Sequence, residues 1–142
     1  MKVRDILNKL GKRALPLVEE GETIEGVVQK MFDHCHTRLV YVVDKDGKFE
    51  GTISLGILIR HLFPHGFEPA IHPRSIISMI TAETAKDIMS RRMINATEED
   101  DVEDVIKRMI RAGVKEIAVV NKENKIVGDI TMLDLLKYYV TD

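Results

Sequence analysis

The feature that most constrains the fold of this chain is an internal repeat with a spacing of 78 residues. An apolar stripe in each half has the i, i+3, i+4, i+7, i+8 spacing of a helix that packs on a core. The first stripe comprises Ile24, Val27, Val28, Met31 and Phe32, and the second comprises Val102, Val105, Ile106, Met109 and Ile110. The period exceeds the roughly 20–50 residues of solenoid units. Two copies of one α/β unit are therefore the simpler interpretation.

A predicted β-hairpin follows each of these helices. A β-branched run, a short polar turn and a returning strand occur in the same order in both halves. The predicted strands are Leu39–Val43 and Phe49–Ser54 in the first half, and Ile117–Val120 and Ile126–Thr131 in the second. Gly51 and Gly128 occupy equivalent places in the returning strands, which indicates a bend or a close backbone approach.

Shorter elements complete each half. A small helix and an extended stretch are expected before the long helix, and another helix after the hairpin. These are Val3–Leu7, Leu15–Val18 and Leu55–Phe63 in the first half, and Ala85–Met89, Met93–Ala96 and Met132–Val140 in the second. The proline-rich segment between the halves interrupts the repeat, and we interpret it as an ordered connector. The predicted division is therefore 1–63, 64–82 and 83–142.

Composition excludes several classes of function. A formal charge of −2 argues against a general electrostatic grip on nucleic acid or on an acidic membrane. Aromatic residues make up 5% of the chain and tryptophan is absent, so stacking platforms for single-stranded nucleic acid are scarce. No apolar run approaches the roughly 20 residues of a membrane span. The single cysteine, Cys35, fits a reducing compartment. We expect a cytoplasmic protein.

The ordered motifs resemble those of the cystathionine-β-synthase (CBS) domain family. The second half carries Asp87-Ile88-Met89, the strand Ile117–Val120 and Gly128-Asp129-Ile130-Thr131-Met132-Leu133-Asp134. It departs from the family at Ala118, where proline is common, and at Asp129, where an apolar residue is usual. The first half matches more loosely, through Asp5-Ile6-Leu7 and Gly51-Thr52-Ile53-Ser54. The resemblance covers nearly the whole chain apart from the connector.

The resemblance implies an α/β fold of two pseudo-symmetric motifs packed as one module. Each motif would be a small sheet of about three strands flanked by helices. Clefts between such motifs commonly accept AMP, ADP, ATP or S-adenosylmethionine, and the modules often form homodimers. No obligatory cofactor is implied. The expected function is regulatory, with an unidentified protein partner receiving the signal. The alternative is a structural module for dimerisation or protein interaction that binds no ligand.

Thr131 and Asp134 are the central candidates for nucleotide binding. A hydroxyl at a helix start lies among free backbone N–H groups, which favours a phosphate there. A carboxylate one turn later can accept hydrogen bonds from both ribose hydroxyls. Thr-x-x-Asp is also a variant of the capping box, and the tetrapeptide alone favours that interpretation. The surrounding family pattern favours the nucleotide.

The resemblance implies further contacts to the ligand. Backbone groups of one stretch would meet the adenine edge, a second stretch would line base and ribose, and a basic residue of the partner motif would reach the phosphate. These candidates are, in the same order, Ile94, Asn95 and Ala96; Lys115, Glu116 and Ile117; and Arg38. For Lys115 and Arg38, a solvated charge at a strand end is an equal alternative. Core packing is the stronger interpretation for Ile94 and Ile117.

The first half provides an internal control. Alignment of Gly51 with Gly128 places Ile57 opposite Asp134. Ile57 cannot accept a hydrogen bond from ribose, so we expect one nucleotide per chain.

No pattern indicates catalysis or a metal site. The chain lacks a glycine-rich phosphate loop and a His-Glu-x-x-His motif. The run His34-Cys35-His36 and the later histidines offer soft ligands, but alternate residues of an extended segment point apart, and a surface loop is the better interpretation. No nucleophile has a positioned base, so we expect no enzymatic activity.

Overall fold

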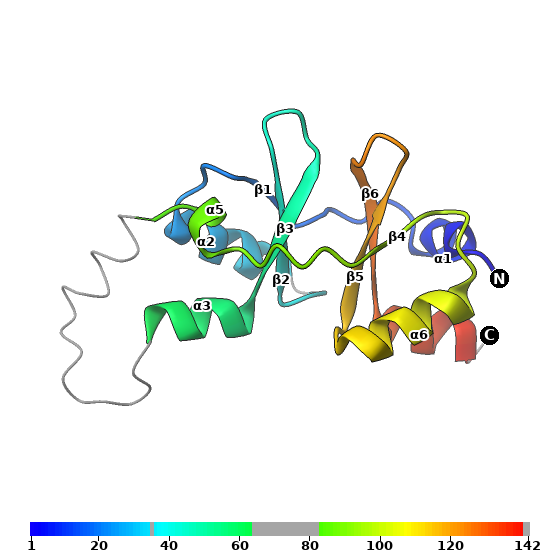
Figure 1. Ribbon diagram of the computed structural model, residues 1–142. Coiled ribbons are helices and arrows are strands. Elements are labelled where there is room, and N and C mark those ends of the chain that lie inside the picture. The colour runs from blue at the N-terminus through cyan, green and yellow to red at the C-terminus, as the bar shows by residue number, and fades with distance from the viewer. Residues whose placement is uncertain (35, 64–82, 141–142) are drawn as a thin grey trace. The chain divides into compact units, whose positions relative to one another are not determined.

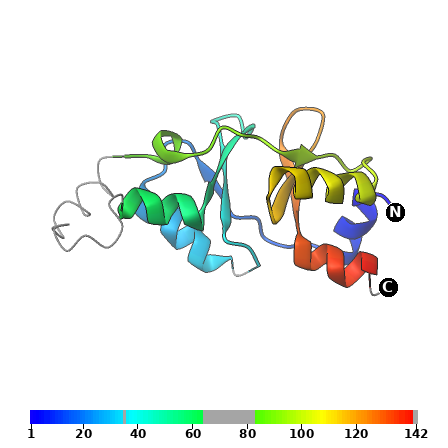
Figure 2. The same ribbon diagram turned by 60° about the horizontal axis from the view of Figure 1, so that its bottom comes forward.

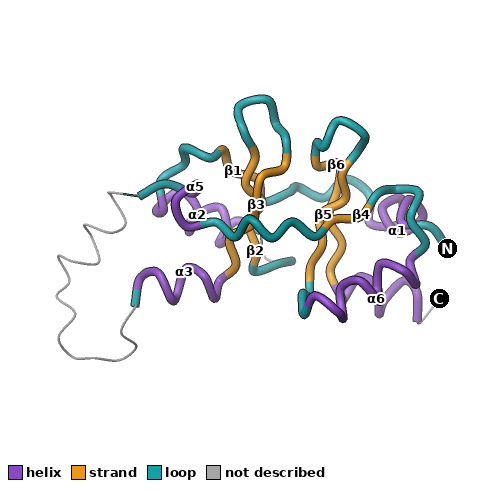
Figure 3. The backbone as a smooth tube through the Cα atoms, viewed as in Figure 1, coloured by secondary structure: helices purple, strands orange, loops and turns teal. Residues whose placement is uncertain are grey.

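The computed structural model of this protein describes residues 1–34, 36–63 and 83–140. The chain forms a mixed α/β structure with two three-stranded sheets and flanking helices (Figures 1 and 3). The predicted fold class is therefore confirmed. Cys35 and the predicted connector at 64–82 lie outside the described residues.

The two sheets have the same strand order. The first contains β1 (Leu17–Glu19), β2 (Leu39–Val43) and β3 (Phe49–Ser54), and the second contains β4 (Asn95–Ala96), β5 (Glu116–Val120) and β6 (Ile126–Thr131). β1 runs parallel to β2, as β4 does to β5, whereas β5 and β6 are antiparallel. The repeat in the sequence is thus a repeat in the structure.

The two apolar stripes form the helices α2 (Ile24–Asp33) and α6 (Val102–Ala112). Thr23 caps the start of α2, where its hydroxyl accepts a hydrogen bond from the Gly26 N–H at 3.0 Å. Gly113 caps the end of α6, where its φ of 69° favours glycine. The remaining helices of the described residues are α1 (Val3–Leu10), α3 (Leu55–Leu62), α5 (Ala85–Ile88) and α7 (Met132–Leu135). α7 continues into a turn of π-helix, η1 (Leu136–Val140).

The two compact units differ from the two halves of the sequence repeat. Unit 1 comprises Met1–Leu15, Gly47–Phe49 and Ile94–Asp142, and unit 2 comprises Pro16–Asp46 and Glu50–Met93. α1 therefore lies with the second sheet and α5 with the first (Figure 1). The two short leading helices are thus exchanged: each lies in the unit that contains the sheet of the other half of the repeat. The motif boundaries read from the sequence stay a prediction, because the compact units follow a different division.

Backbone hydrogen bonds attach the exchanged helices to their units. The Val3 N–H donates to the Asp100 carbonyl at 2.9 Å in unit 1. The Ala85 N–H donates to the Glu22 carbonyl at 2.8 Å in unit 2. Each exchanged helix is thereby fixed to the chain segment that immediately precedes the long helix of its unit.

Each unit has its own apolar core. In unit 1, α6 and the last helical segment lie beside the second sheet (Figure 2), and the buried residues of α1, α6 and α7 form one core with that sheet. The Tyr139 hydroxyl of η1 donates to the Glu103 carboxylate of α6 at 2.5 Å. This core comprises Val3, Ile6, Ala96, Val102, Val105, Met109, Ile117, Val119, Ile130 and Leu135. The core of unit 2 comprises Val18, Ile24, Val27, Val40, Val42, Ile53, Leu58, Ala85 and Met89.

Gly51 and Gly128 allow the segment that follows α5 and the helix α1, respectively, to approach the sheets closely. A Cβ atom on Gly128 would lie 2.8 Å from Cδ2 of Leu7, which belongs to α1. A Cβ atom on Gly51 would lie 2.5 Å from the carbonyl oxygen of Ser90 and 2.8 Å from Sδ of Met89. The predicted close backbone approach is confirmed at Gly51, whereas at Gly128 the close neighbour is the Leu7 side chain.

The two glycines differ in whether the neighbouring atom could move away from an added methyl group. We predict that G51A lowers the free energy of unfolding by about 2–3 kcal/mol, because a backbone carbonyl cannot move aside. G128A should cost about 1 kcal/mol, because the Leu7 side chain can rotate. Denaturant unfolding measures both values. G21A is the control, since nothing lies within 4 Å of that Cβ position. Equal effects of G51A and G128A would contradict the backbone contact.

Candidate functional site

Three stretches of unit 1 meet at one edge of the second sheet. The parallel strands β4 and β5 begin at this edge, and the antiparallel strand β6 ends there, with Glu116 opposite Thr131 in the register. The Met132 N–H donates to the Lys115 carbonyl at 2.8 Å. The start of α7 is therefore fixed beside the start of β5.

Thr131 and Asp134 form a capping box at the start of α7. The Thr131 hydroxyl accepts a hydrogen bond from the Asp134 N–H at 3.1 Å, and Oδ2 of Asp134 accepts one from the Thr131 N–H at 2.9 Å. The structural alternative considered from the sequence is thus present. The role of Asp134 as a ribose ligand stays a prediction.

Arg13 is a residue of this site that the sequence motifs did not reveal. Its Nη1 donates to Oδ1 of Asp134 at 3.1 Å, and its Nη2 donates to Oδ2 of Asp134 at 2.9 Å. The same Nη2 donates to Oδ1 and to the carbonyl oxygen of Asp129, at 2.8 and 2.9 Å. One guanidinium thereby joins two carboxylates that lie more than 100 residues further along the chain.

The cluster is largely shielded from water. The side chains of Arg13, Asp134 and Asp129 are 21%, 13% and 1% exposed. Burial by itself raises the pKa of Asp134, but hydrogen bonds from Arg13 and from the Thr131 N–H, with the charge of Arg13, lower this pKa below its ordinary value. Burial opposes the charge of Arg13, yet its hydrogen bonds with Asp134 and Asp129 raise its pKa. Arg13 and Asp134 therefore form a charged pair near neutral pH.

Asp129 is the residue whose type in the sequence indicates that this site needs a basic partner. A carboxylate stands where the resemblance leads one to expect an apolar residue, inside the strand β6. A carboxylate that is almost fully buried requires a cation or several donors. The departure at Asp129 thus indicates that a basic partner exists, although it does not identify which of the 21 lysines and arginines supplies it.

The other predicted residues of unit 1 have mixed surroundings. Ile117 is 1% exposed and belongs to the core, and Ile94 packs against that core, as the alternative interpretation holds. Ala96 is fully buried. Lys115 is exposed and Glu116 half-buried. Of these residues, Lys115 and Glu116 lie nearest to the capping box in the strand register.

Arg108 is a second basic residue near the predicted adenine-binding stretch. Its Nη1 donates to the carbonyl oxygen of Asn95 at 2.7 Å and to Oδ2 of Asp100 at 3.1 Å. The Asn95 carbonyl keeps one lone pair for a further donor. The bond from Arg108 therefore leaves this backbone group able to accept from a further donor, such as one on an adenine edge.

Arg38 lies in unit 2 at the position equivalent to Lys115. The Leu55 N–H donates to the Arg38 carbonyl at 3.0 Å, which reproduces the bond from Met132 to Lys115. This match supports the alignment on which the choice of Arg38 rests. Its predicted contact with a phosphate stays a prediction.

The equivalent site in unit 2 lacks the carboxylate. The Ser54 hydroxyl accepts a hydrogen bond from the Ile57 N–H at 3.1 Å, as Thr131 does from Asp134. The Ile57 side chain packs against the core of unit 2. The backbone geometry is thus repeated while the chemistry is not.

The pattern of the CBS domain family matches residues 1–64 and 85–141. The chain belongs to the CBS domain family. The two matched regions correspond to the two motifs of the sequence repeat, so the protein is a CBS domain pair. The resemblance of the motifs is thereby confirmed.

Solved structures of the family share the fold. A CBS domain-containing protein from Thermotoga maritima is 30% identical, with a TM-score of 0.77, and the match covers 100% of this chain and 96% of that one. The CBS domain pair of protein MJ0100, in complex with 5′-methylthioadenosine and S-adenosylmethionine, is 21% identical with a TM-score of 0.73, covering 99% and 96% of the chains.

Other relatives are longer than this chain. The cytosolic domain of the Mg²⁺ channel MgtE, in complex with ATP, is 26% identical with a TM-score of 0.64, and the match covers 85% of this chain and 43% of that one. An uncharacterized protein of Methanopyrus kandleri is 28% identical over 82% of this chain and 53% of its own length. The chain thus spans about half of the length of this curated relative.

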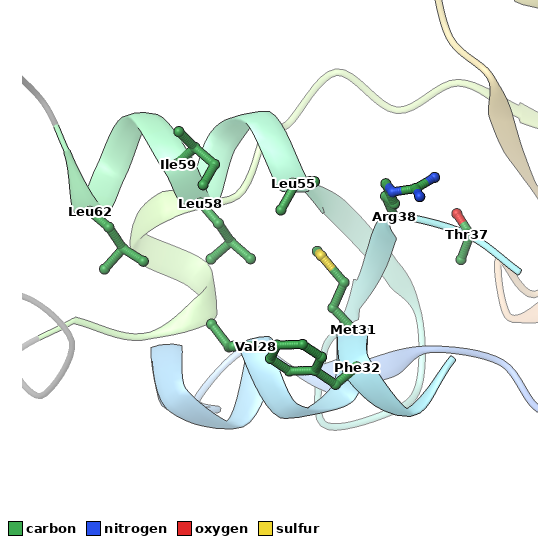
Figure 4. A pocket seen from close by; sticks show the side chains of 9 residues that line it. All are labelled: Val28, Met31, Phe32, Thr37, Arg38, Leu55, Leu58, Ile59 and Leu62. Atoms are coloured by element: carbon green, nitrogen blue, oxygen red, sulfur yellow. The ribbon is translucent and has the colours of Figure 1, made fainter. Parts of the chain in front are cut away.

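Unit 2 of the CBS pair carries an apolar cavity of about 400 Å³ between α2 and α3. Figure 4 shows side chains of the two helices facing each other across it, with Thr37 and Arg38 at one end. The other lining residues are Val28, Met31, Phe32, Leu55, Leu58, Ile59 and Leu62. Phe32 is 74% exposed, so the apolar lining continues onto the surface.

Within the described ranges, no helix is both long and apolar enough to cross a membrane. The same ranges hold no group of three or more histidine, cysteine, aspartate and glutamate side chains suited to a metal ion.

The lowered pKa of Asp134 generates a pH-dependent prediction. A carboxyl group whose pKa is lower in the folded state contributes stability above its unfolded pKa of about 3.9, and this contribution disappears as the pH falls through the folded pKa. In a double-mutant cycle of R13Q and D134N, we expect a coupling free energy of about 1–3 kcal/mol at pH 7 that falls toward zero below about pH 4. Denaturant unfolding across this range measures it. A coupling that stays constant down to pH 3 would contradict the ion pair.

Proposed function

We propose that this CBS domain pair is a regulatory module that binds an adenosine compound, with the ribose diol at Asp134. Eight of the nine predicted binding residues belong to unit 1. The observation that carries the proposal is the meeting of β4, β5 and the start of α7 at one sheet edge. This arrangement supplies backbone groups for a base and a carboxylate for a sugar.

The ligand class is supported by the family. The related pair of protein MJ0100 is seen with two adenosine compounds, and the MgtE domain is seen with ATP. Each of these ligands contains adenine joined to a ribose that bears two adjacent hydroxyls. We therefore propose AMP, ADP, ATP or S-adenosylmethionine as the ligand of this chain.

Regulation would follow from differential affinity. A ligand shifts the balance between two conformations only if it binds one of them more tightly. The signal would pass to a separate protein without any catalytic step in this chain. A homodimer is the proposed assembly that would carry it.

One observation favours a second candidate, a structural module that binds no ligand. The Asp134 carboxylate already has the Thr131 N–H and Arg13 as partners. These contacts alone would explain an aspartate at this position. Ligand titration of variants at Asp134 separates the two functions.

We predict that D134A weakens adenosine binding by roughly 10- to 100-fold, because two hydrogen bonds to a charged group are lost. Isothermal titration calorimetry with AMP, ADP, ATP and S-adenosylmethionine measures this change. D134N is the companion variant, because its amide oxygen can still accept the Thr131 N–H while the charge is removed. It should also weaken binding.

The matched control is D87A. Asp87 forms a capping box with Thr84 at the start of α5, so its substitution removes the same local contact without touching the proposed site. D87A should bind the ligand as wild type does. Equal affinity of wild type, D134A and D134N for every adenosine compound would support the structural module instead.

The apolar helix faces support the proposed homodimer. Exposed apolar side chains recur at equivalent positions of the repeat: Phe32 and Ile110, Ile59 and Leu136, and Phe63 and Val140. Each of these six side chains is at least 44% exposed. Such a repeated apolar surface on a small protein marks an interaction site. A second copy of this chain presents the same surface, which suits a two-fold interface.

We predict that F32E weakens the dimer by at least about 2 kcal/mol, which corresponds to roughly 30-fold, because a charge would enter the apolar interface. Sedimentation velocity over a concentration series measures the dimer dissociation constant. M93E is the control, since Met93 is 46% exposed but lies outside the helices. A wild-type chain that remains a monomer at all concentrations would contradict the assembly.

A further inference from the structure

The hydrogen-bonding capacity of Asp134 is nearly exhausted. An ionised carboxylate offers about four acceptor positions on its two oxygens. Oδ1 accepts from Nη1 of Arg13, and Oδ2 accepts from Nη2 of Arg13 and from the Thr131 N–H. About one position, on Oδ1, is left for another donor.

A ribose diol needs two acceptor positions on this carboxylate, one for each hydroxyl. With Arg13 in place, only one hydroxyl can be accommodated. We propose that Arg13 is an internal competitor of the ribose, a latch that must leave Asp134 before the sugar can bind. This inference rests on the proposed function, since it assumes that Asp134 binds the ribose.

The surroundings of Arg13 allow such a movement. Nη2 also donates to the side chain and the carbonyl of Asp129, so the guanidinium keeps an ionic partner when Asp134 is released. Nε of Arg13 is buried and has no hydrogen-bond partner in this arrangement. A buried donor without a partner costs free energy, so the latched state is less stable than a fully bonded one. The guanidinium can thus pivot about Asp129.

The other half of the chain offers a comparison that lacks these carboxylates. Arg91 follows Arg13 by the 78-residue spacing of the repeat and is exposed. The residues equivalent to Asp129 and Asp134 are Thr52 and Ile57, which carry no charge. Arg91 is therefore a natural control, in which the same residue type precedes the equivalent strand without an acidic cluster.

The proposed movement of Arg13 would affect the chain segment that leads from unit 1 into unit 2. Arg13 lies near the end of the first segment of unit 1, Met1–Leu15. The next residue, Pro16, begins unit 2. Release of Arg13 from Asp134 removes the side-chain contact that holds this segment on α7, while its contacts with Asp129 on β6 remain. Ligand binding would thus be linked to the freedom of this segment.

The experiment compares AMP with 2′,3′-dideoxy-AMP, which lacks both hydroxyls but retains base and phosphate. The ratio of their dissociation constants isolates the contribution of the diol, so any contact of Arg13 with the phosphate cancels. Calorimetry is performed on wild type, R13Q and R91Q. We expect R13Q to increase the preference for AMP roughly tenfold, equivalent to 1.4 kcal/mol, while R91Q leaves it unchanged.

A second variant covers the case in which R13Q fails to fold because Asp129 is left without a cation. R13Q/D129N removes both charges and should show the same tenfold gain. An unchanged or smaller preference for AMP in the variants at Arg13 would overturn the latch.

The outcomes separate the latch from the proposed function. If wild type binds AMP through Asp134, as D134A shows, and R13Q leaves the ratio unchanged, only the latch is overturned. If neither wild type nor the variants at Arg13 bind AMP, both the latch and AMP binding at Asp134 fail. Binding that is detectable only after substitution of Arg13 would support both.

Discussion

The ion cluster of Arg13, Asp129 and Asp134 is the interaction on which the site depends. Two carboxylates this well shielded from water would repel each other without the guanidinium between them. The cation comes from the segment after α1, the carboxylates from β6 and from the start of α7. The cluster thus ties the N-terminal segment to the part of the unit that begins the last helix. Under the proposed latch, the same contacts would set both stability and ligand access.

Close approach of the exchanged helices brings Arg13 to this place. α1 packs on β6 because Gly128 leaves room for Leu7, and the chain then continues from Gly11 to Arg13 beside the same strand. The first sheet uses the same device, with Gly51 against the backbone of Ser90. Gly128 therefore acts indirectly on the site, since it positions the helix from which the arginine segment extends.

The sequence predicted the local elements well and the long-range pairing poorly. The stripe from Ile24 to Phe32 and the β-branched run Leu39–Val43 have periodicities that depend only on neighbouring residues. The assignment of α1 to the second sheet depends on contacts between residues far apart in the chain, which no periodicity records. Asp129 signalled a missing cation, but Arg13 could be recognised only when folding placed it within hydrogen-bonding distance.

The chemistry of Thr131 and Asp134 explains why the sequence singles out these residues without deciding between their possible roles. One tetrapeptide serves as a capping box, as an ion-pair partner and as the proposed ribose ligand, because a carboxylate accepts from any suitable donor. Arg38 belongs to the other unit, and its role follows only from its equivalence to Lys115. Family membership defines the ligand class more narrowly than local geometry does.

The most direct test is a pair of crystal structures of the whole chain, without ligand and with AMP. The account predicts that Asp134 contacts Arg13 in the first structure. In the second, both ribose hydroxyls should lie within hydrogen-bonding distance of the Asp134 carboxylate, with Arg13 held by Asp129 alone. A bound AMP whose ribose avoids Asp134, while Arg13 keeps both bonds to that carboxylate, would contradict it.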